Sequence, residues 1–176
     1  MRTKTAIDFL ETVVASFRKE DPDMGLPQEL FHFVSRSTPI VNVDLLIKDE
    51  QGRVLLSWRD DQFAGSGWHI PGGIVRFKET MEERLVKVAD IEIGRELEHD
   101  PSPVCFKEVF LPHDTRGHFV SFLYNCFLSS DFEPSNLDSQ KQETDPGFLK
   151  WHERCPDNLV SVQEMYRPYI EGTYFV

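Results

Sequence analysis

The sequence has few cysteines and no long apolar run. Its three cysteines, Cys105, Cys126 and Cys155, are odd in number and widely spaced among 176 residues, and no C-x-x-C pair occurs. This spacing excludes a disulfide framework and a zinc knuckle, and it predicts reduced thiols in a cytoplasmic protein. Asp8 and Glu11 interrupt the apolar residues near the N-terminus, and no apolar stretch is long enough to span a bilayer. We therefore expect neither a secretion signal nor a membrane partner.

Positive charge is also scarce. The chain has 19 Lys and Arg residues against 30 Asp and Glu residues, and its formal net charge is −11. Proteins that bind nucleic acids draw affinity from many Lys and Arg contacts to phosphate, so this balance excludes a nucleic acid as the main partner. A small polyphosphate remains possible, because it needs only a local cluster of positive charge and brings a metal ion with it.

The sequence contains no internal repeat, no low-complexity tract and no clear domain boundary. Its length suits one domain, since a chain of this size buries roughly 70% of its unfolded surface. Apolar residues recur at helical spacing over residues 6–17, and residues 21–23 (Asp-Pro-Asp) would end that helix. We therefore expect a helical extension at residues 1–23 and the main domain at residues 24–176.

Strands and helices alternate along the main domain. Strands are expected at residues 40–47, 53–58, 68–70, 74–77, 104–111, 118–128 and 148–151. The first two would form a hairpin, and residues 65–67 would be a flexible loop. Short helical structure is expected around residues 27–34, and a closing helix at residues 158–171. Thr80 and Glu83 form a capping box that begins a further helix, which Gly94 would end. The polar residues 129–146 form a long loop of the kind that often serves as a lid or binding loop.

Residues 67–94 are the most informative stretch. They join the glycine pair Gly72-Gly73 to the capped helix, whose far end carries Glu92. A glycine loop can approach a diphosphate closely, and a carboxylate opposite can hold the metal ion that diphosphates require. The plainer alternatives are a Pro-Gly-Gly turn and a solvated helix glutamate. The combination favours chemistry on a nucleotide-type substrate.

This stretch resembles the signature of the Nudix hydrolases. Four residues match it: Gly73, Glu79, Glu92 and Gly94. Three depart from it: Lys87, Val88 and Ile91 stand in place of Arg, Glu and Glu. One branch of the family, the GDP-mannose mannosyl hydrolases, also lacks two of the usual helix carboxylates, and the chain resembles that branch in this respect. Residues 24–41, Trp151 and residues 158–170 look like that branch too.

The resemblance implies a fold and a reaction. The fold would be α+β, an α/β/α sandwich with a mixed sheet between helices, here with an extra N-terminal helix. The protein would be a homodimer that uses Mg²⁺, or Mn²⁺, to hydrolyse a nucleotide sugar. Water would attack the anomeric carbon of a GDP-linked hexose and release GDP and mannose. Two alternatives remain: hydrolysis of a phosphoanhydride bond in another nucleoside diphosphate derivative, and a binding module with little turnover.

The resemblance also implies metal ligands and substrate contacts. Glu92 and the backbone carbonyl of Gly72 would bind the metal, and Gln142 is a further candidate, although a surface glutamine is an equal alternative. Arg59 would lie near the substrate, and Asp44 near the sugar or the metal. Asp44 is also notable because a charged residue within an apolar strand requires pairing or a cavity.

Further catalytic candidates lie at or near the positions where this sequence differs from the branch. Ile74 replaces an arginine of the branch, but Arg76, two residues on, would share its strand face and could bind the diphosphate. Lys87 keeps a positive charge for the substrate, and it could also pair with Glu79. Glu143 stands where the branch has its general base, a histidine, and Phe119 replaces a tyrosine. Other candidates for the base are the histidines His113, His118 and His152, and His113 is also a candidate substrate contact.

Overall fold

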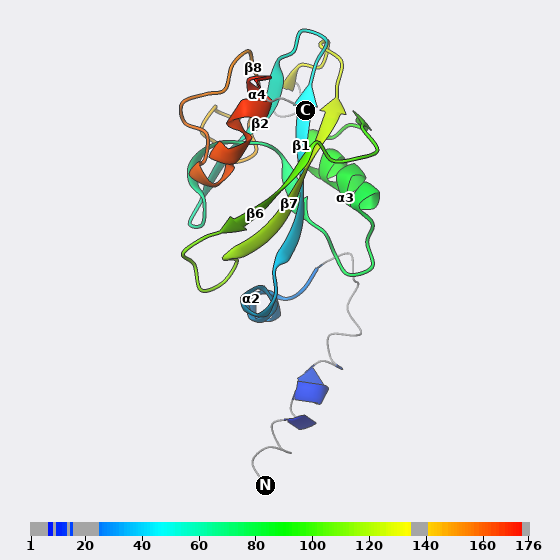
Figure 1. Ribbon diagram of the computed structural model, residues 1–176, viewed down its shortest axis with the longest axis vertical. Coiled ribbons are helices and arrows are strands. Elements are labelled where there is room, and N and C mark those ends of the chain that lie inside the picture. Colours follow the sequence, from blue (N-terminus) through cyan, green and yellow to red (C-terminus); the bar gives the residue numbers. More distant parts are fainter. Residues whose placement is uncertain (1–6, 9, 14, 16–24, 135–140, 174–176) are drawn as a thin grey trace.

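The computed structural model describes residues 7, 8, 10–13, 15, 25–134 and 141–173. Within these ranges a mixed eight-stranded sheet lies between helices (Figure 1). Its strands are β1 (Ile40–Lys48), β2 (Val54–Asp61), β3 (Gly65–His69), β4 (Gly72–Ile74), β5 (Glu98–His99), β6 (Cys105–Phe110), β7 (His118–Phe127) and β8 (Leu149–His152). The helical elements are α2 (Gln28–Ser37), α3 (Met81–Val88), the π-helical turn η2 (Ala89–Ile93), the 3₁₀ helix η4 (Ser161–Tyr166) and α4 (Arg167–Ile170).

The sheet is built around two parallel strands. β1 and β7 pair in parallel from Ile40 opposite Phe119 to Lys48 opposite Phe127. The main path runs β3-β2-β1-β7-β5, while β4 also pairs with β1, β6 with β7 and β8 with β2. All these other pairs are antiparallel. The predicted mixed sheet and α+β class are therefore confirmed.

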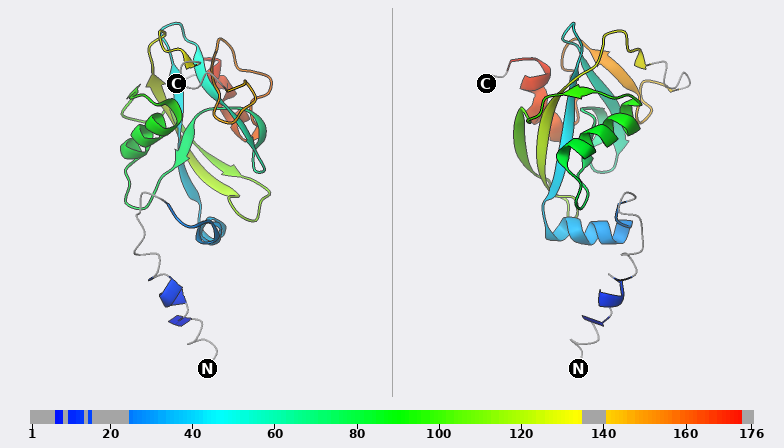
Figure 2. Two further views of the ribbon diagram at one scale, coloured as in Figure 1. Left: turned by 180° about the vertical axis from the view of Figure 1, so that it is seen from behind. Right: turned by 90° about the vertical axis from the view of Figure 1, so that its right-hand side faces the viewer.

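Helices cover both faces of this sheet. α3 and η2 lie on one face, and η4 and α4 lie on the other (Figure 2). Successive side chains of a strand point to opposite faces, so β1 contributes to both layers. Val43 packs with α3, whereas Leu46 packs with Tyr166 of η4. Asp44 shares the face of Leu46, which places a carboxylate under η4.

The continuous helical segment made of α3 and η2 begins and ends where the sequence predicts. The Thr80 hydroxyl accepts a hydrogen bond from the Glu83 amide (3.1 Å), and the Glu83 carboxylate accepts one from the Thr80 amide (2.7 Å). At the other end Gly94 has φ 70°, a left-handed conformation that glycine adopts without strain. No residue pattern predicts that the last turn, η2, is π-helical.

The predicted strand at residues 74–77 is wrong. β4 ends at Ile74. Two residues later the Arg76 amide donates to the Glu79 carboxylate (2.8 Å), and Lys78 adopts a left-handed φ of 63°. The Glu79 side chain therefore closes a turn that takes the chain out of the sheet, and Arg76 lies in a loop.

One further expectation is confirmed and two need correction. The expected hairpin of β1 and β2 is present, with Lys48 opposite Val54 at its closed end, and β2 then pairs with β3 and β8. The loop expected at residues 65–67 is part of β3, which pairs with the end of β2. The closing helix is η4 followed by α4, because Pro168 has no amide to continue an earlier α-helix and suits a first turn instead.

The N-terminal extension is described only in part. Residues 7, 8, 10–13 and 15 are helical, and Ile7 and Leu10 have exposed side chains. The rest of the predicted helix and the boundary at residues 23 and 24 lie outside the described residues, so the division of the chain into two parts stays a prediction. In the part of the chain that the structure covers, no helix is both long and apolar enough to cross a membrane.

Candidate active site

A cavity of about 310 Å³ lies where β1, β4 and β7 meet η2 and η4. Six charged residues line it: Asp44, Glu92, Arg59, Arg76, Arg84 and Arg116. An adjoining cavity of about 440 Å³ extends toward Lys141 and shares Arg59, His69, Gly72, Ile91 and Glu92 with the first. These shared residues mark the centre of the candidate site.

Asp44 is buried at the floor of the first cavity. Its side chain is held by three donors: the Ser121 hydroxyl (2.7 Å), the Tyr166 hydroxyl (2.9 Å) and the Asn42 amide (2.9 Å). Burial raises the pKa of Asp44 to about 6, although these hydrogen bonds and Arg59 oppose the shift. The carboxylate is thus fixed in position and sensitive to any further cation.

Gly72 connects Asp44 with Glu92. It lies directly opposite Asp44 in the β1–β4 pair, and a Cβ at this position would be 2.4 Å from the Asp44 Oδ1. Only glycine lets the backbone approach this closely. The Gly72 amide donates to the Glu92 carboxylate, whose pKa burial raises to about 7, with Asp44 adding to the shift and Arg59 opposing it. Two carboxylates therefore converge on the backbone of Gly72.

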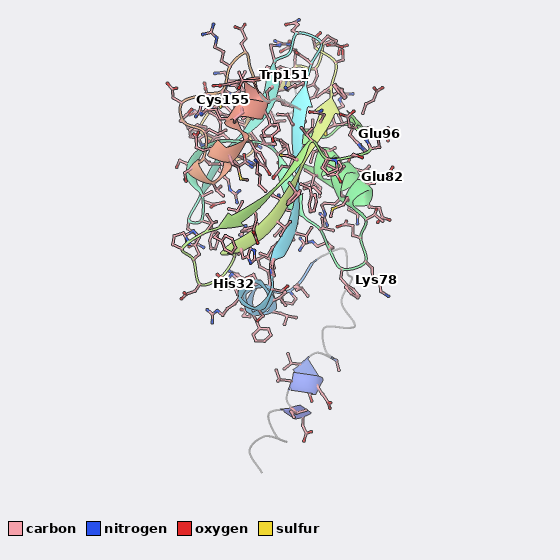
Figure 3. All side chains as sticks on the ribbon, in the orientation of Figure 1. His32, Lys78, Glu82, Glu96, Trp151 and Cys155 are labelled. Carbon is pink, nitrogen blue, oxygen red and sulfur yellow. The ribbon has the colours of Figure 1, made fainter. Side chains whose placement is uncertain are left out.

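The π-helical turn η2 places Glu92. The buried apolar positions of α3 and η2 are Leu85, Val88, Ala89 and Ile93. Glu92, next to Ile93 in the wide turn, lines the cavity, and Ile91 is 75% exposed at its rim. Glu82 and Glu96 lie on the outer side of the molecule (Figure 3). Among the described residues, Glu92 is the one carboxylate of α3 and η2 that lines either cavity.

The donor set suits a magnesium ion. No group of three or more His, Cys, Asp or Glu side chains that could hold a metal occurs among the residues with assigned structure. Mg²⁺ needs few such ligands, because it usually takes one or two carboxylates and fills its octahedron with water and substrate oxygens. Asp44 is buried and Glu92 is partly buried, and burial raises the pKa of both although Arg59 opposes the shift. A divalent ion at Gly72 would oppose that rise further.

Gln142 and Glu143 are not brought into this site. Both are exposed and line neither cavity. The Gln142 amide donates to Asp145 (2.8 Å), and Glu143 forms an ion pair with Lys150 (2.8 Å). Their assignment depended on matching positions across the long loop, where no regular element fixes the register.

Arg59 and Arg76 both line the first cavity. Arg59, near the end of β2, has its Nε bonded to Asp61. Arg76 reaches the cavity from its loop, and its guanidinium lies against Gly25, where a Cβ would be 2.8 Å from Nη1. The buried Nε of Arg76 has no hydrogen-bond partner among the described residues. Arg76 is thus placed for a ligand, although by a different backbone from the predicted strand.

Lys87 lies outside both cavities and is 41% exposed. Its Nζ is 3.2 Å from the Glu79 carboxylate, as expected for the ion pair that fixes loop to helix. Glu79 has a second partner that sequence reasoning missed: Arg84 is 2.7 Å from the same carboxylate and lines the cavity. A buried arginine in the middle of a helix has no sequence signature of its own.

The histidines are also placed differently from the expectation. His113 contacts Phe63, a residue of the cavity lining, through its Nε2, which is 3.2 Å from the Phe63 carbonyl. His118 pairs with the exposed Glu108. His152 packs edge-on to Trp68, and burial lowers its pKa to about 4. None of these three histidines lines either cavity.

His69 lines both cavities and was missed. Its Nδ1 is 2.9 Å from the Ile70 carbonyl, which can only accept, so Nδ1 carries the proton and Nε2 has a free lone pair. Burial and the charge of Arg59 lower the pKa of His69 to about 4, so the ring is neutral. Its position just before Pro71-Gly72 was the available signal.

The chain was compared with family models, with known proteins and with solved structures. No protein-family model matches the chain. The low-salt glycan biosynthesis protein Agl8 of Haloferax volcanii is 28% identical over 138 residues, which cover 76% of this chain and 88% of that protein.

Two solved structures share the architecture. A MutT protein from Methanosarcina mazei superimposes with a TM-score of 0.57 at 17% identity and covers 76% of this chain and 94% of its own. A possible asymmetric diadenosine tetraphosphate hydrolase from Jonesia denitrificans does so with a TM-score of 0.56 at 22% identity, over 79% and 99% of the two chains. As the sequence resemblance predicts, this chain has the fold of the Nudix hydrolases.

Proposed function

We propose that the protein hydrolyses a nucleoside diphosphate sugar, of which GDP-mannose is the type, in a reaction that depends on Mg²⁺ or Mn²⁺. The observation that carries this proposal is the convergence of Asp44 and Glu92 on the backbone of Gly72, beside Arg59. The Nudix fold supports a hydrolase of this broad kind. The name of the similar Haloferax protein, which refers to glycan biosynthesis, adds support for a sugar-linked substrate.

The charge of the cavity suits a small anion. Its lining has four arginines and two carboxylates, a formal excess of two positive charges, although the chain has a net charge of −11. Such a local reversal of sign attracts a compact polyphosphate and not an extended polyanion. A diphosphate substituted at both ends carries two negative charges, which this excess would balance.

Each site residue has a role in the proposed reaction. A bound Mg²⁺ would neutralise and polarise the diphosphate. Glu92 and the Gly72 carbonyl would hold that ion, and Arg59 would donate to the diphosphate oxygens. Asp44, fixed by Ser121 and Tyr166, would orient the ion or a sugar hydroxyl.

The proton of the attacking water needs an acceptor. Glu143, the acceptor expected from the sequence, lies outside the cavities. We assign this role to His69, which lines both cavities and whose Nδ1 faces the Ile70 carbonyl, so that Nε2 keeps its lone pair. A weak base suffices if the bond to a good leaving group breaks early, and a neutralised diphosphate is such a group.

We infer that the bond broken is the one between carbon and oxygen. Val88 and Ile91 are apolar at two positions where carboxylates would be needed for further metal ions, and Val88 is packed beneath Gly73. A single helix carboxylate fits one metal ion, which favours departure of the whole diphosphate. Hydrolysis of a phosphoanhydride bond is the second candidate, because the fold itself supports it.

Labelled water distinguishes these reactions. After incubation of the protein with GDP-mannose and Mg²⁺ in H₂¹⁸O, we expect the label in mannose, as measured by mass spectrometry of both products. Label in a phosphate product would instead establish phosphoanhydride hydrolysis. Binding of GDP-mannose without any metal-dependent product would favour a binding module.

Arg76 provides a second test. Replacing Arg76 with alanine should lower kcat/KM for the nucleotide sugar by about tenfold or more, equivalent to roughly 1.4 kcal/mol of lost transition-state binding. Arg154→Ala, an exposed arginine outside both cavities, is the matched control and should leave kcat/KM unchanged. If the two variants have the same steady-state kinetics, Arg76 does not contact the substrate.

The homodimer implied by the family resemblance and the cytoplasmic location expected from the cysteines stay predictions. Sedimentation of the purified protein would measure the first directly.

A further inference from the structure

Arg116, in the loop between β6 and β7, is a charged residue of the cavity for which neither the sequence nor the family resemblance suggests a role. Its Nε is buried and has no hydrogen-bond partner in the described part of the chain. Its φ of 56° is left-handed, a conformation that costs a residue with a Cβ about 1 kcal/mol or more. A strained residue with an unsatisfied buried donor suggests a function.

The surroundings hold this guanidinium in place. Its central carbon is 4.5 Å from the ring centroid of Phe63 and 5.8 Å from that of Phe31. The Arg116 amide donates to the hydroxyl of Ser35, which, like Phe31, belongs to α2 (3.2 Å). Arg36, also in α2, donates to the carbonyl of Asp114 in the same loop (3.4 Å). Contacts from α2 and from the loop after β2 thus orient Arg116 before any ligand arrives.

Asp61 links Arg116 to Arg59. One Asp61 oxygen bonds to Arg59, and the other accepts from the amides of Phe63 and Ala64 (2.8 Å each). Asp61 therefore fixes Arg59 directly, and it fixes Phe63, on which Arg116 lies. Burial and the charge of Arg59 lower the pKa of Arg116, and Asp61 offsets this only in part. Arg59 and Arg116 line the same cavity and, among the described residues, have only the Asp61 carboxylate between them. One positive charge is therefore not balanced locally, and an anionic ligand could balance it.

We propose that Arg116 binds a phosphate group of the ligand and forms, with Arg59, a two-arginine clamp for the diphosphate. Only the identity of the natural ligand rests on the proposed function. A guanidinium donates through a planar fork that fits two phosphate oxygens, and its other face remains free to stack on an aromatic ring. Phe63 and Phe31 provide that stacking, and Arg116 lines the cavity that the anion would enter.

The test uses two variants of the full chain and two phosphate probes. Arg116→Gln removes the charge. Arg116→Gly also removes it, and places at φ 56° the residue that best tolerates that backbone. Binding of inorganic pyrophosphate and of GDP, each with Mg²⁺, is measured by calorimetry. We expect both variants to bind both probes at least about tenfold more weakly than the wild type, the loss of one charge-assisted phosphate contact.

Thermal unfolding separates this role from a structural one. Arg116→Gly should unfold at or above the wild-type midpoint, because it relieves the strained backbone, and it should nevertheless lose affinity. Arg154→Gln, an exposed arginine outside the cavities, should bind both probes like the wild type.

Either of two results would overturn the inference: equal affinity of wild type and both variants, or no binding of either probe by the wild type. A wild type that binds pyrophosphate through Arg116 but hydrolyses no nucleotide sugar would refute the proposed function alone. Metal-dependent turnover with unchanged KM and affinity in Arg116→Gly would refute the role of Arg116 alone.

Discussion

Replacing Glu92 with glutamine is expected to lower metal-dependent turnover of a nucleotide sugar by about a thousandfold or more, a loss near 4 kcal/mol of transition-state stabilisation. Glutamine keeps the size of the side chain and can still accept from the Gly72 amide. It lacks the charge that holds a divalent ion, so the fold should survive while the metal site is lost. Initial rates over a range of Mg²⁺ concentrations measure the effect.

The same substitution should change how stability depends on pH. Without metal, the pKa of Glu92 is about 7 in the folded protein against an ordinary value of 4.5. An acid with a raised folded pKa contributes stability below pH 4.5, and this contribution is lost as the pH rises through about 7. This rise in the pKa of Glu92 corresponds to a loss of about 3 kcal/mol in the free energy of unfolding between low and high pH. Unfolding of the metal-free wild type should therefore become easier between about pH 5 and 8, and Mg²⁺ should restore stability at the upper end.

Glu82→Gln is the matched control, since Glu82 lies on the exposed side of α3 (Figure 3). It should keep wild-type turnover and the wild-type response to Mg²⁺, while Glu92→Gln should show a flatter pH dependence and no stabilisation by Mg²⁺. Full activity in Glu92→Gln would exclude this carboxylate as the metal ligand.

Replacing Gly72 with alanine should be the most disruptive single-methyl change at the site. The added Cβ would be 2.4 Å from the Asp44 Oδ1 and 2.7 Å from the Val43 carbonyl. Neither atom can move freely, because Asp44 is held by three donors and Val43 belongs to the central strand. We expect the free energy of unfolding to fall by about 3 kcal/mol and activity to be lost. Urea titration and initial rates measure the two effects.

Gly65→Ala gives the comparison for that variant. Gly65 has φ 77°, and a Cβ there would meet nothing within 4 Å. The substitution should therefore cost only about 1 kcal/mol of backbone strain, with activity retained. Equal costs for the two variants would mean that the site around Gly72 is loosely packed.

Most of the fold follows from local patterns. The β-branched run at residues 40–47 predicts β1, and the strands expected at residues 104–111, 118–128 and 148–151 lie within one or two residues of β6, β7 and β8. The Thr80 and Glu83 box and Gly94 bound the central helix because each satisfies orphan backbone groups. The errors fall where a distant side chain decides the backbone, as Glu79 does for the turn that ends β4.

The site was only partly predictable for the same reason. Gly72 and Glu92 are joined by a short stretch with its own signals, so the sequence places them together. Arg116 reaches the cavity through tertiary packing, and nothing in its immediate neighbours indicates this. For His69 the nearness of Pro71-Gly72 was the only local signal. For Glu143 a long loop leaves the register undefined, and the structure pairs it with Lys150 at the surface.

The π-helical turn η2 limits how this enzyme-like scaffold could be redesigned. Glu92 and Ile93 are neighbours in this turn, and one lines the cavity while the other is fully buried. Deleting one residue of η2 would turn every later residue by about 100° around the helix axis. A change meant to make the helix regular would therefore move the carboxylate away from the cavity and the isoleucine out of the core.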